Sequence, residues 1–218
     1  MKLITGLYSI DSCQTVFSEK FQNNRRNWEI VDSETEQANI TDGYYHMLNK
    51  TYSRWNYYST GTGLNSKQEF LIDCMIELEN NIDHFGHFGL LWGYGTEREY
   101  LNRFSLSSNG KRLVVAHFQK DHHVICHRFY NPQFLSINTQ QPVRFTIIRL
   151  GSYFHFYLNS MEVYMAHVSL FCDEGHNIGF YVEPKLRIRS NFLEVKKIKA
   201  TSLPLLTGLQ QLMHKVPL

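Results

Sequence analysis

Residues 69–79 read EFLIDCMIELE, and two further extended stretches follow: FGHFGLLWGYG (85–95) and EYLNRF (99–104). In the first stretch, every second side chain is apolar: Phe70, Ile72, Cys74, Ile76 and Leu78. A period of two places these side chains on one face of a β-strand, whereas a helix would distribute them around its whole circumference. The opposite face mixes acidic and apolar residues, so we expect other groups to line it. The three stretches therefore predict neighbouring strands of a large antiparallel sheet.

The rest of the chain alternates short apolar segments with turn signals, at about the 8–12-residue spacing that is typical of β-sandwiches. Asp42-Gly43 and Asn109-Gly110 are pairs favoured in two-residue hairpin turns, and Asn159-Ser160 is a third turn candidate. We count about a dozen candidate strands and find no repeat of fixed period. The pattern predicts an all-β fold in which two antiparallel sheets pack against each other.

The chain divides into an N-terminal strand or arm (1–16), a β domain (17–200) and a C-terminal amphipathic segment (201–218). In the last of these, apolar residues recur at helical spacing after Pro204: Leu205, Leu206, Leu209, Leu212, Met213 and Val216. This spacing predicts a short C-terminal helix or tail that closes over one edge of the fold. The alternative is a helix that docks on a partner protein.

The charges of the chain are evenly balanced, with 22 basic and 20 acidic residues and a net charge of +2. This balance does not provide the clustered basic face that nucleic-acid binding requires, so we expect no nucleic-acid partner. We expect no membrane span either, because no apolar run reaches the ~18 residues of a spanning helix. The apolar run near Met1 is interrupted by polar residues and by Asp11, which argues against a signal peptide. We therefore expect a cytoplasmic protein.

The four cysteines, Cys13, Cys74, Cys126 and Cys172, lie far apart in the sequence, and no two form a CxxC pair. Cys74 falls on the apolar face of its strand, so we expect it to act as a small buried hydrophobic side chain. A chain of 218 residues can bury enough surface to fold without disulfides. We expect reduced thiols.

Histidines and a cysteine gather in residues 117–127, which raises the question of a metal site. On a strand, His123 and His127 would share one face. His122 and Cys126 would share the other, so neither face offers three neighbouring ligands for zinc. We therefore predict no metal site and no cofactor.

Short motifs follow one another in a characteristic order: Phe17, Trp28, Asp42-Gly43-Tyr44, Gly89-Leu90-Leu91-Trp92-Gly93, Phe104-Ser105-Leu106, Asn109-Gly110, Arg144-Phe145, Arg149, Phe156-Tyr157-Leu158-Asn159, Ile178-Gly179-Phe180 and a closing strand at 192–198. In this order, residues 17–199 resemble the concanavalin A-like lectin/glucanase superfamily. The resemblance implies a two-sheet antiparallel jelly-roll sandwich. The chain looks most similar to the non-enzymatic, laminin G-like or carbohydrate-module members that occur as accessory domains in bacteria.

Family 16 glycoside hydrolases of this superfamily carry Glu-x-Asp-x-(x)-Glu on the strand after the Trp-bearing one. The corresponding residues here are 99–104, and Asn102 and Arg103 stand where carboxylates are needed. Glu69, Asp73 and Glu77 do share a face of the earlier strand, at a spacing of four residues. Their spacing separates neighbours by about 13 Å, however, against the ~5–5.5 Å that a retaining pair requires. We therefore favour a protein without catalytic activity, and an unusual glycoside hydrolase is the last alternative.

Aromatic rings stack on sugar faces, and arginine forks bind hydroxyls or carboxylates. On this basis we predict ligand-binding roles for Trp55, Tyr57, His87, Tyr94, Arg98, Arg103 and His155. His87, Arg103 and His155 lie opposite the apolar faces of their strands. If that face is the concave side of a sheet, these three residues line a groove.

The sequence thus favours a non-catalytic binding module that recognises a glycan or similar ligand on the concave sheet or its rim loops. The alternative is a protein–protein interaction domain that docks a partner through residues 201–218.

Overall fold

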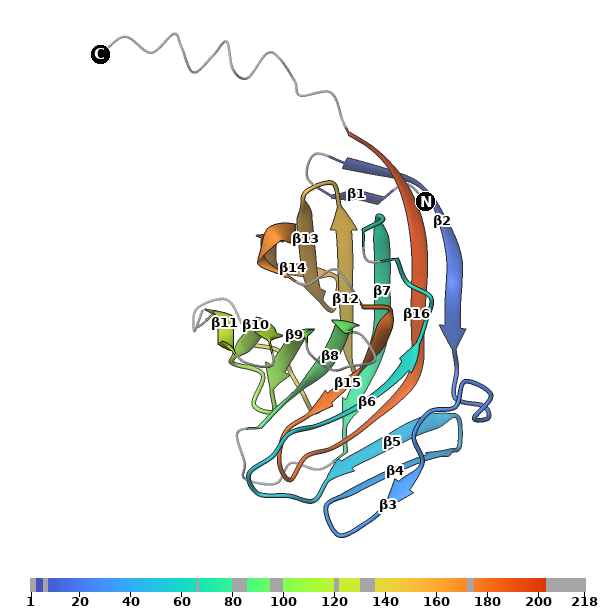
Figure 1. Cartoon of the computed structure of the whole chain (residues 1–218), viewed down its shortest axis with the longest axis vertical. Helices are drawn as coiled ribbons and strands as arrows, with labels where there is room; N and C mark the ends of the chain where they lie inside the picture. The colour runs from blue at the N-terminus through green and yellow to red at the C-terminus, as the bar shows by residue number, and fades with distance from the viewer. Residues whose placement is uncertain are drawn as a thin grey trace, which may run out of the picture.

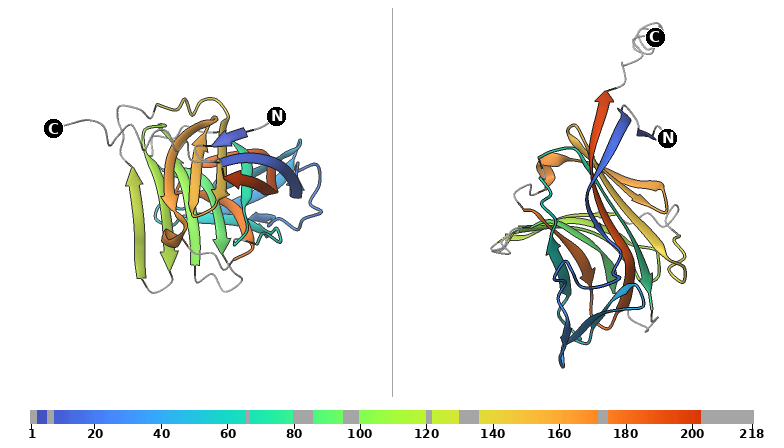
Figure 2. Two further views of the ribbon diagram at one scale, coloured as in Figure 1. Left: turned by 90° about the horizontal axis from the view of Figure 1, so that it is seen from above. Right: turned by 90° about the vertical axis from the view of Figure 1, so that its right-hand side faces the viewer.

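The computed structural model describes residues 3–5, 8–65, 67–79, 86–94, 100–119, 122–129, 136–171 and 175–202. These residues form two antiparallel sheets that stack as layers of a sandwich (Figures 1 and 2). The predicted all-β jelly-roll sandwich is confirmed. Among the residues described, no helix has the length and hydrophobicity to cross a membrane.

One sheet has ten strands and the other has six. The ten-stranded sheet contains β1 (Leu3–Thr5), β2 (Tyr8–Glu19), β3 (Val31–Asp32), β4 (Glu36–Thr41), β5 (Tyr44–Asn49), β7 (Phe70–Leu78), β12 (Val143–Leu150), β13 (Tyr153–Leu158), β14 (Met161–His167) and β16 (Arg187–Ser202). The six-stranded sheet contains β6 (Asn56–Gly61), β8 (His87–Tyr94), β9 (Tyr100–Ser107), β10 (Leu113–Gln119), β11 (His122–Phe129) and β15 (Asn177–Val182). A single 3₁₀ turn, η1 (Val168–Leu170), is also present among the described residues.

Strand order explains why β7 has such a regular pattern. β7 lies inside the ten-stranded sheet between β12 and β16, whereas β8 and β9 lie next to each other in the six-stranded sheet. The three stretches of residues 69–104 are therefore all strands, but they belong to two sheets. The alternating apolar side chains of β7 are buried between the layers: Phe70, Ile72, Cys74 and Ile76.

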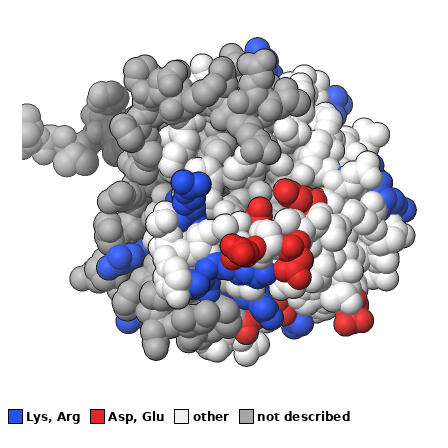
Figure 3. All heavy atoms as spheres, turned by 60° about the horizontal axis from the view of Figure 1, so that its bottom comes forward, with Lys and Arg blue, Asp and Glu red and all other residues white. Residues whose placement is uncertain are grey.

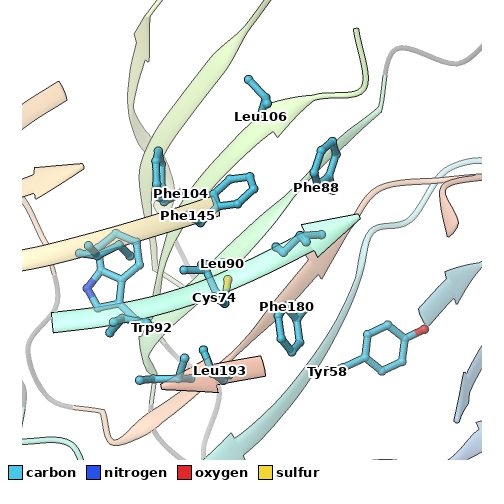
Figure 4. Packing of buried hydrophobic residues seen from close by; sticks show 14 of the residues in the cluster. Tyr58, Cys74, Phe88, Leu90, Trp92, Phe104, Leu106, Phe145, Phe180 and Leu193 are labelled. Atoms are coloured by element: carbon cyan, nitrogen blue, oxygen red, sulfur yellow. The ribbon is translucent and has the colours of Figure 1, made fainter. Parts of the chain in front are cut away.

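The core between the sheets is rich in aromatic rings (Figure 4). The Phe104 ring of β9 lies 5.3 Å from the Phe145 ring of β12 and 5.1 Å from the Phe156 ring of β13, measured between centroids. Trp92 of β8 lies 5.7 Å from Phe156. These contacts join the two sheets, because Phe145 and Phe156 belong to one layer and Phe104 and Trp92 to the other.

Cys13 and Cys74, whose side chains the structure describes, are free thiols. Cys74 is buried in the core, as predicted, and burial raises the pKa of its thiol well above the usual range. Cys74 therefore stays protonated at neutral pH and packs as an apolar side chain. Cys13 is exposed, whereas Cys172 and the side chain of Cys126 lie outside the described residues.

Two of the predicted turns have the expected geometry. Asp42 and Gly43 link β4 to β5 with φ angles of 52° and 76°, and Asn159 and Ser160 link β13 to β14 with φ angles of 49° and 69°. Positive φ at both central residues is the hairpin geometry that matches strand twist.

The prediction of a two-residue hairpin at Asn109-Gly110 is wrong, because residues 108–112 separate β9 from β10. Hydrogen bonds from the backbone N–H groups of Lys111 and Arg112 to Ser107 Oγ hold this connection from within, and another segment also contacts it. The carbonyl oxygen of Gly110 accepts a hydrogen bond from the backbone N–H of Ile137 at 3.2 Å. The Thr139 hydroxyl donates to the carbonyl oxygen of Ser108 at 2.5 Å.

The predicted division of the chain can be compared with the strands. The boundary drawn between residues 16 and 17 falls inside β2, which pairs with β16 along most of its length. β16 continues to Ser202, so it passes the boundary drawn at residue 200. The helix predicted in the C-terminal segment lies outside the described residues.

Gly110→Ala should destabilise the protein more than Gly63→Ala. Both glycines have similar positive φ angles, 70° and 67°, so both substitutions carry a similar backbone cost. A Cβ at Gly110 would lie 1.9 Å from the carbonyl oxygen of Ile137, whereas a Cβ at Gly63 would meet nothing within 4 Å. Urea unfolding should show a loss of about 1 kcal/mol for Gly63→Ala and a clearly larger loss for Gly110→Ala. Equal losses would mean that the Ile137 contact is unimportant.

Candidate functional site

The outer face of the six-stranded sheet, turned away from the core, carries the candidate site. On β15, Phe180 and Val182 point into the core, so Tyr181 points to the outer face. Tyr181 is almost fully buried there. Its ring and hydroxyl contact groups from neighbouring strands. Four predicted site residues lie near Tyr181 or near Glu183, two residues further along the chain: Trp55, Tyr57, His87 and Arg103.

Arg103 on β9 is the centre of a hydrogen-bond network. Its Nη1 donates to the Tyr181 hydroxyl at 2.6 Å, its Nη2 donates to Glu183 Oε1 at 3.0 Å, and its Nε donates to Ser105 Oγ at 2.7 Å. The guanidinium carbon also lies 3.8 Å from the centroid of the Tyr181 ring. Only 6% of Arg103 is exposed, so its charge is held almost entirely by protein groups.

Gly89 lies on β8, the strand between Arg103 and its partners on the side of β15. β8 lies between β9 and β15, and Gly89 pairs with Ser105 on one side and with Tyr181 on the other. A Cβ at Gly89 would lie 2.2 Å from the carbonyl oxygen of Phe104, which is too close for any other residue. Gly89 therefore lets the backbones of β8 and β9 approach closely, and the Arg103 side chain crosses β8 to reach Tyr181 and Glu183.

Glu183 accepts hydrogen bonds at both of its carboxylate oxygens. Oε2 accepts from the backbone N–H of His87 at 2.8 Å and lies 3.1 Å from His87 Nδ1. Oε1 accepts from Arg103 and from the Tyr181 hydroxyl. Burial alone would raise the pKa of Glu183, but the hydrogen bonds from His87 and the charge of Arg103 outweigh it and lower the pKa to about 2. The carboxylate is therefore ionised throughout the physiological range.

An aromatic cluster borders this network. The Trp55 ring lies 5.5 Å from Tyr181, 5.6 Å from Tyr57 and 6.2 Å from Phe118 between ring centroids. The cluster also includes buried Leu91 and Leu101. Trp55 remains 38% exposed, so it covers the buried rings with one part of its surface and presents the other part to solvent.

The loop that carries Trp55 is held by Asn49, the last residue of β5. The buried Asn49 amide nitrogen donates to the carbonyl oxygens of Arg54 at 2.7 Å and of Val182 at 3.0 Å. This ties the loop to the end of β15. Tyr52 in the same loop is 81% exposed, and Lys185 Nζ lies 3.5 Å from its ring centroid. The loop thus presents two aromatic side chains at the rim of the outer face.

His155 does not lie with the other predicted site residues. It belongs to β13 of the ten-stranded sheet, where its Nδ1 lies 2.7 Å from Glu162 Oε1. The hypothesis of one groove lined by His87, Arg103 and His155 is therefore wrong, because the strands belong to different sheets. Arg98 and the side chain of Tyr94 lie outside the described residues.

Tyr181, Glu183 and Tyr52 are not among the site residues predicted from the sequence. The alternation of Ile178, Phe180 and Val182 already places Tyr181 on the opposite face, as the same argument did for Arg103. The position of Glu183 could not be predicted from the local pattern, because it depends on the pairing of β15 with β8, which brings Glu183 beside His87.

The described outer-face positions of β6, β8, β9, β10 and β15 offer no second carboxylate beside Glu183. On β9 these positions hold Leu101, Arg103 and Ser105. Within the described ranges, no group of three His, Cys, Asp or Glu side chains could hold a metal ion. The described residues of this face can therefore present aromatic and polar surface to a ligand, and among them Glu183 has no second carboxylate beside it.

Glu183→Gln should lower stability in a pH-dependent way. The pKa of Glu183 falls from 4.5 to about 2 on folding. Ionisation of Glu183 therefore contributes about 3 kcal/mol of stability above pH 4.5, which is lost as the pH falls toward 2. Urea unfolding at pH 7 and near pH 3 should show a variant deficit that shrinks at the lower pH. Glu34→Gln, at an exposed position, should show no deficit at either pH. A deficit of constant size would contradict the role of the charge.

Comparison with known proteins agrees with the fold. No protein-family model matches the chain, and no curated protein matches its sequence. A structure of the endo-acting O-glycanases of human gut microbiota has a TM-score of 0.63 at 9% identity, covering 85% of this chain and 100% of that one. The catalytic domain of an endo-1,3-β-glucanase (laminarinase) from Thermotoga petrophila RKU-1 has a TM-score of 0.59 at 9% identity, covering 87% and 100%.

An endo-β-1,3-glucanase from Pyrococcus furiosus has a TM-score of 0.57 at 8% identity, covering 87% of this chain and 96% of that one. At these identities the likeness shows the fold alone. The structural neighbours have the jelly-roll fold of the concanavalin A-like type, so this part of the predicted resemblance is confirmed.

Proposed function

We propose that this chain is a non-catalytic glycan-binding module whose binding surface is centred on Trp55. The proposal rests on the partly exposed Trp55 ring. It packs on Tyr57 and Tyr181, yet 38% of the residue is exposed to solvent. A large aromatic ring fixed in this way offers a flat apolar face at little cost in side-chain entropy. Sugar rings have apolar faces of matching shape.

The Arg103 network supports this surface without contacting the ligand. Arg103 is nearly buried and all three of its nitrogens donate within the protein. Its hydrogen bond and ring contact fix Tyr181, and Tyr181 packs against Trp55. We assign Trp55 and Tyr57 to ligand contact, and Arg103 and His87 to positioning.

Two considerations favour binding over hydrolysis. A retaining glycosidase needs two carboxyl groups about 5–5.5 Å apart, one of which starts protonated. Glu183 has a low pKa and has both oxygens occupied by hydrogen bonds, so it is suited neither to donate a proton nor to attack a sugar. The choice of glycan as the ligand class is supported by the structural neighbours, which are named as glycanases and glucanases.

Trp55→Ala should weaken glycan binding strongly. A glycan array would identify the ligand, and titration calorimetry with that glycan should show a loss of at least about tenfold in affinity for Trp55→Ala. Trp55→Phe keeps an aromatic ring and should retain most of the affinity. Tyr153→Ala removes an exposed ring on β13 of the other sheet and should have no effect.

Absence of glycan binding on the array would contradict the proposal and favour the alternative of a protein-docking domain. Release of reducing sugar from any array glycan would instead favour a hydrolase.

A further inference from the structure

A hollow opens on the side of the sandwich opposite Trp55, on the outer face of the ten-stranded sheet. It has a volume of about 520 Å³, within the range of about 300–1,000 Å³ for ligand pockets. Its walls come from the β4–β5 turn, β7, β12, β16 and the residues after β2. Two smaller hollows, of about 320 and 140 Å³, share Glu79 at the end of β7.

Asp73 and Arg144 form a rigid polar element at this hollow. Arg144 Nε donates to Asp73 Oδ1 at 2.9 Å, and Arg144 Nη2 bonds the other carboxylate oxygen. The Thr146 hydroxyl donates to Asp73 Oδ1 at 2.8 Å. Asp73 is buried, whereas 47% of the Arg144 side chain is exposed. The guanidinium is thus fixed along one edge, and its Nη1 has no partner among the described residues.

Asn191 adds an acceptor that the described residues leave unsatisfied. It lies at the irregularity in β16 between Ser190 and Phe192, where the register with β7 shifts. Bulges of this kind re-aim side chains. The Asn191 Oδ1 atom is buried and has no hydrogen-bond partner among the described residues, although Asn191 lines the hollow. A rotation of the Asn191 side chain into the hollow would bring this acceptor to a ligand hydroxyl, and an unsatisfied buried acceptor is costly.

Two half-buried rings, Tyr44 and Phe192, complete the lining. The Arg189 guanidinium carbon lies 4.3 Å from the centroid of the Tyr44 ring and restrains it. The hollow therefore combines ring surface with fixed donors and acceptors, which is the composition that suits a polyhydroxylated ligand.

The charges at this surface argue against an anionic ligand. The basic residues of the hollow are Lys20 and Arg144, and its acidic residues are Asp42, Asp73 and Glu194. Glu194 also pairs with Lys196 at 2.9 Å, outside the hollow. Acidic and basic side chains likewise adjoin one another on the face in Figure 3. Because opposite charges lie together, no cationic patch is present here to attract an acidic chain.

Two of the three hollows follow the outer face of β7, and the smallest lies beside them over β4 and β5. Asp73 lines the first, Glu77 the second, and Glu79 both smaller ones. Six residues of strand span about 20 Å, which suits an extended chain better than a compact molecule.

From these observations we propose a second binding site, a groove along β7 that takes a neutral oligosaccharide chain. The site shares no described residue with the Trp55 surface and does not rest on it. The Nη1 of Arg144 donates to sugar oxygens, Asn191 accepts from a hydroxyl, and the rings of Tyr44 and Phe192 contact the apolar sugar face.

NMR titration of the full chain tests this site separately from the first. The probes are laminarihexaose, cellohexaose and a neutral O-glycan core oligosaccharide, with tetragalacturonate as the acidic comparison. At least one neutral probe should shift the backbone amide signals of Tyr44, Asn191 and Phe192, in wild type and in Trp55→Ala alike. Its affinity should not change between about 50 and 500 mM salt, because screening affects only charged ligands.

Asn191→Ala should weaken this binding by about tenfold while leaving the thermal midpoint near that of wild type. Should this variant fail to fold, Arg144→Lys provides the second test, because lysine keeps the charge beside Asp73 but loses the planar fork. Shifts confined to the Trp55 loop would overturn the second site and leave the first intact. The second site would also be overturned if no neutral probe shifted amide signals near β7, or if tetragalacturonate bound there more tightly than the neutral probes.

Discussion

Packing of aromatic rings between the two sheets is the constraint on which the rest of the structure depends. Phe104 is fully buried against Phe145 and Phe156. Burial of each such ring contributes about 1.5–3 kcal/mol, and a slip of one residue would turn the whole inward set to solvent. Because strand side chains alternate, fixing Phe104 inward fixes Arg103 and Ser105 outward. The core therefore determines the candidate site, even though it contributes no atom to it.

Hydrogen bonds of Arg103 hold the outer face of the six-stranded sheet together. A guanidinium that is almost fully buried is costly unless its donors are satisfied. Here Ser105 on β9, Tyr181 on β15 and Glu183 just after β15 satisfy it. A closed network of this kind is well suited to hold a surface still. The same saturation makes it unsuited to bond cleavage, where a carboxylate must exchange a proton or attack a carbon.

Features that depend on residues close together in the sequence could be predicted from it, and features that depend on distant residues could not. The alternation in residues 69–104 is local, so the strands and the outward parity of His87 and Arg103 were predictable. The Asp42-Gly43 turn is also local. The Asn109-Gly110 connection is longer than the predicted two-residue turn, and it includes a hydrogen bond from distant Ile137 as well as local bonds to Ser107 Oγ. His155 has the right parity but lies in the other sheet, because parity gives the face of a strand and does not assign the strand to a sheet. Glu183 became visible only through strand order.

The two outer faces of the sandwich thus differ in kind. On one face, a buried network around Arg103 lies beside the partly exposed Trp55 ring. On the other, a hollow contains the Asp73–Arg144 ion pair. The central claim is that Trp55 on the first face binds a glycan that stays intact. A crystal structure with the oligosaccharide selected by a glycan array tests it most directly. We expect an uncleaved sugar ring stacked on Trp55, with Glu183 still bonded to Arg103. A cleaved sugar, or no sugar at Trp55, would contradict it.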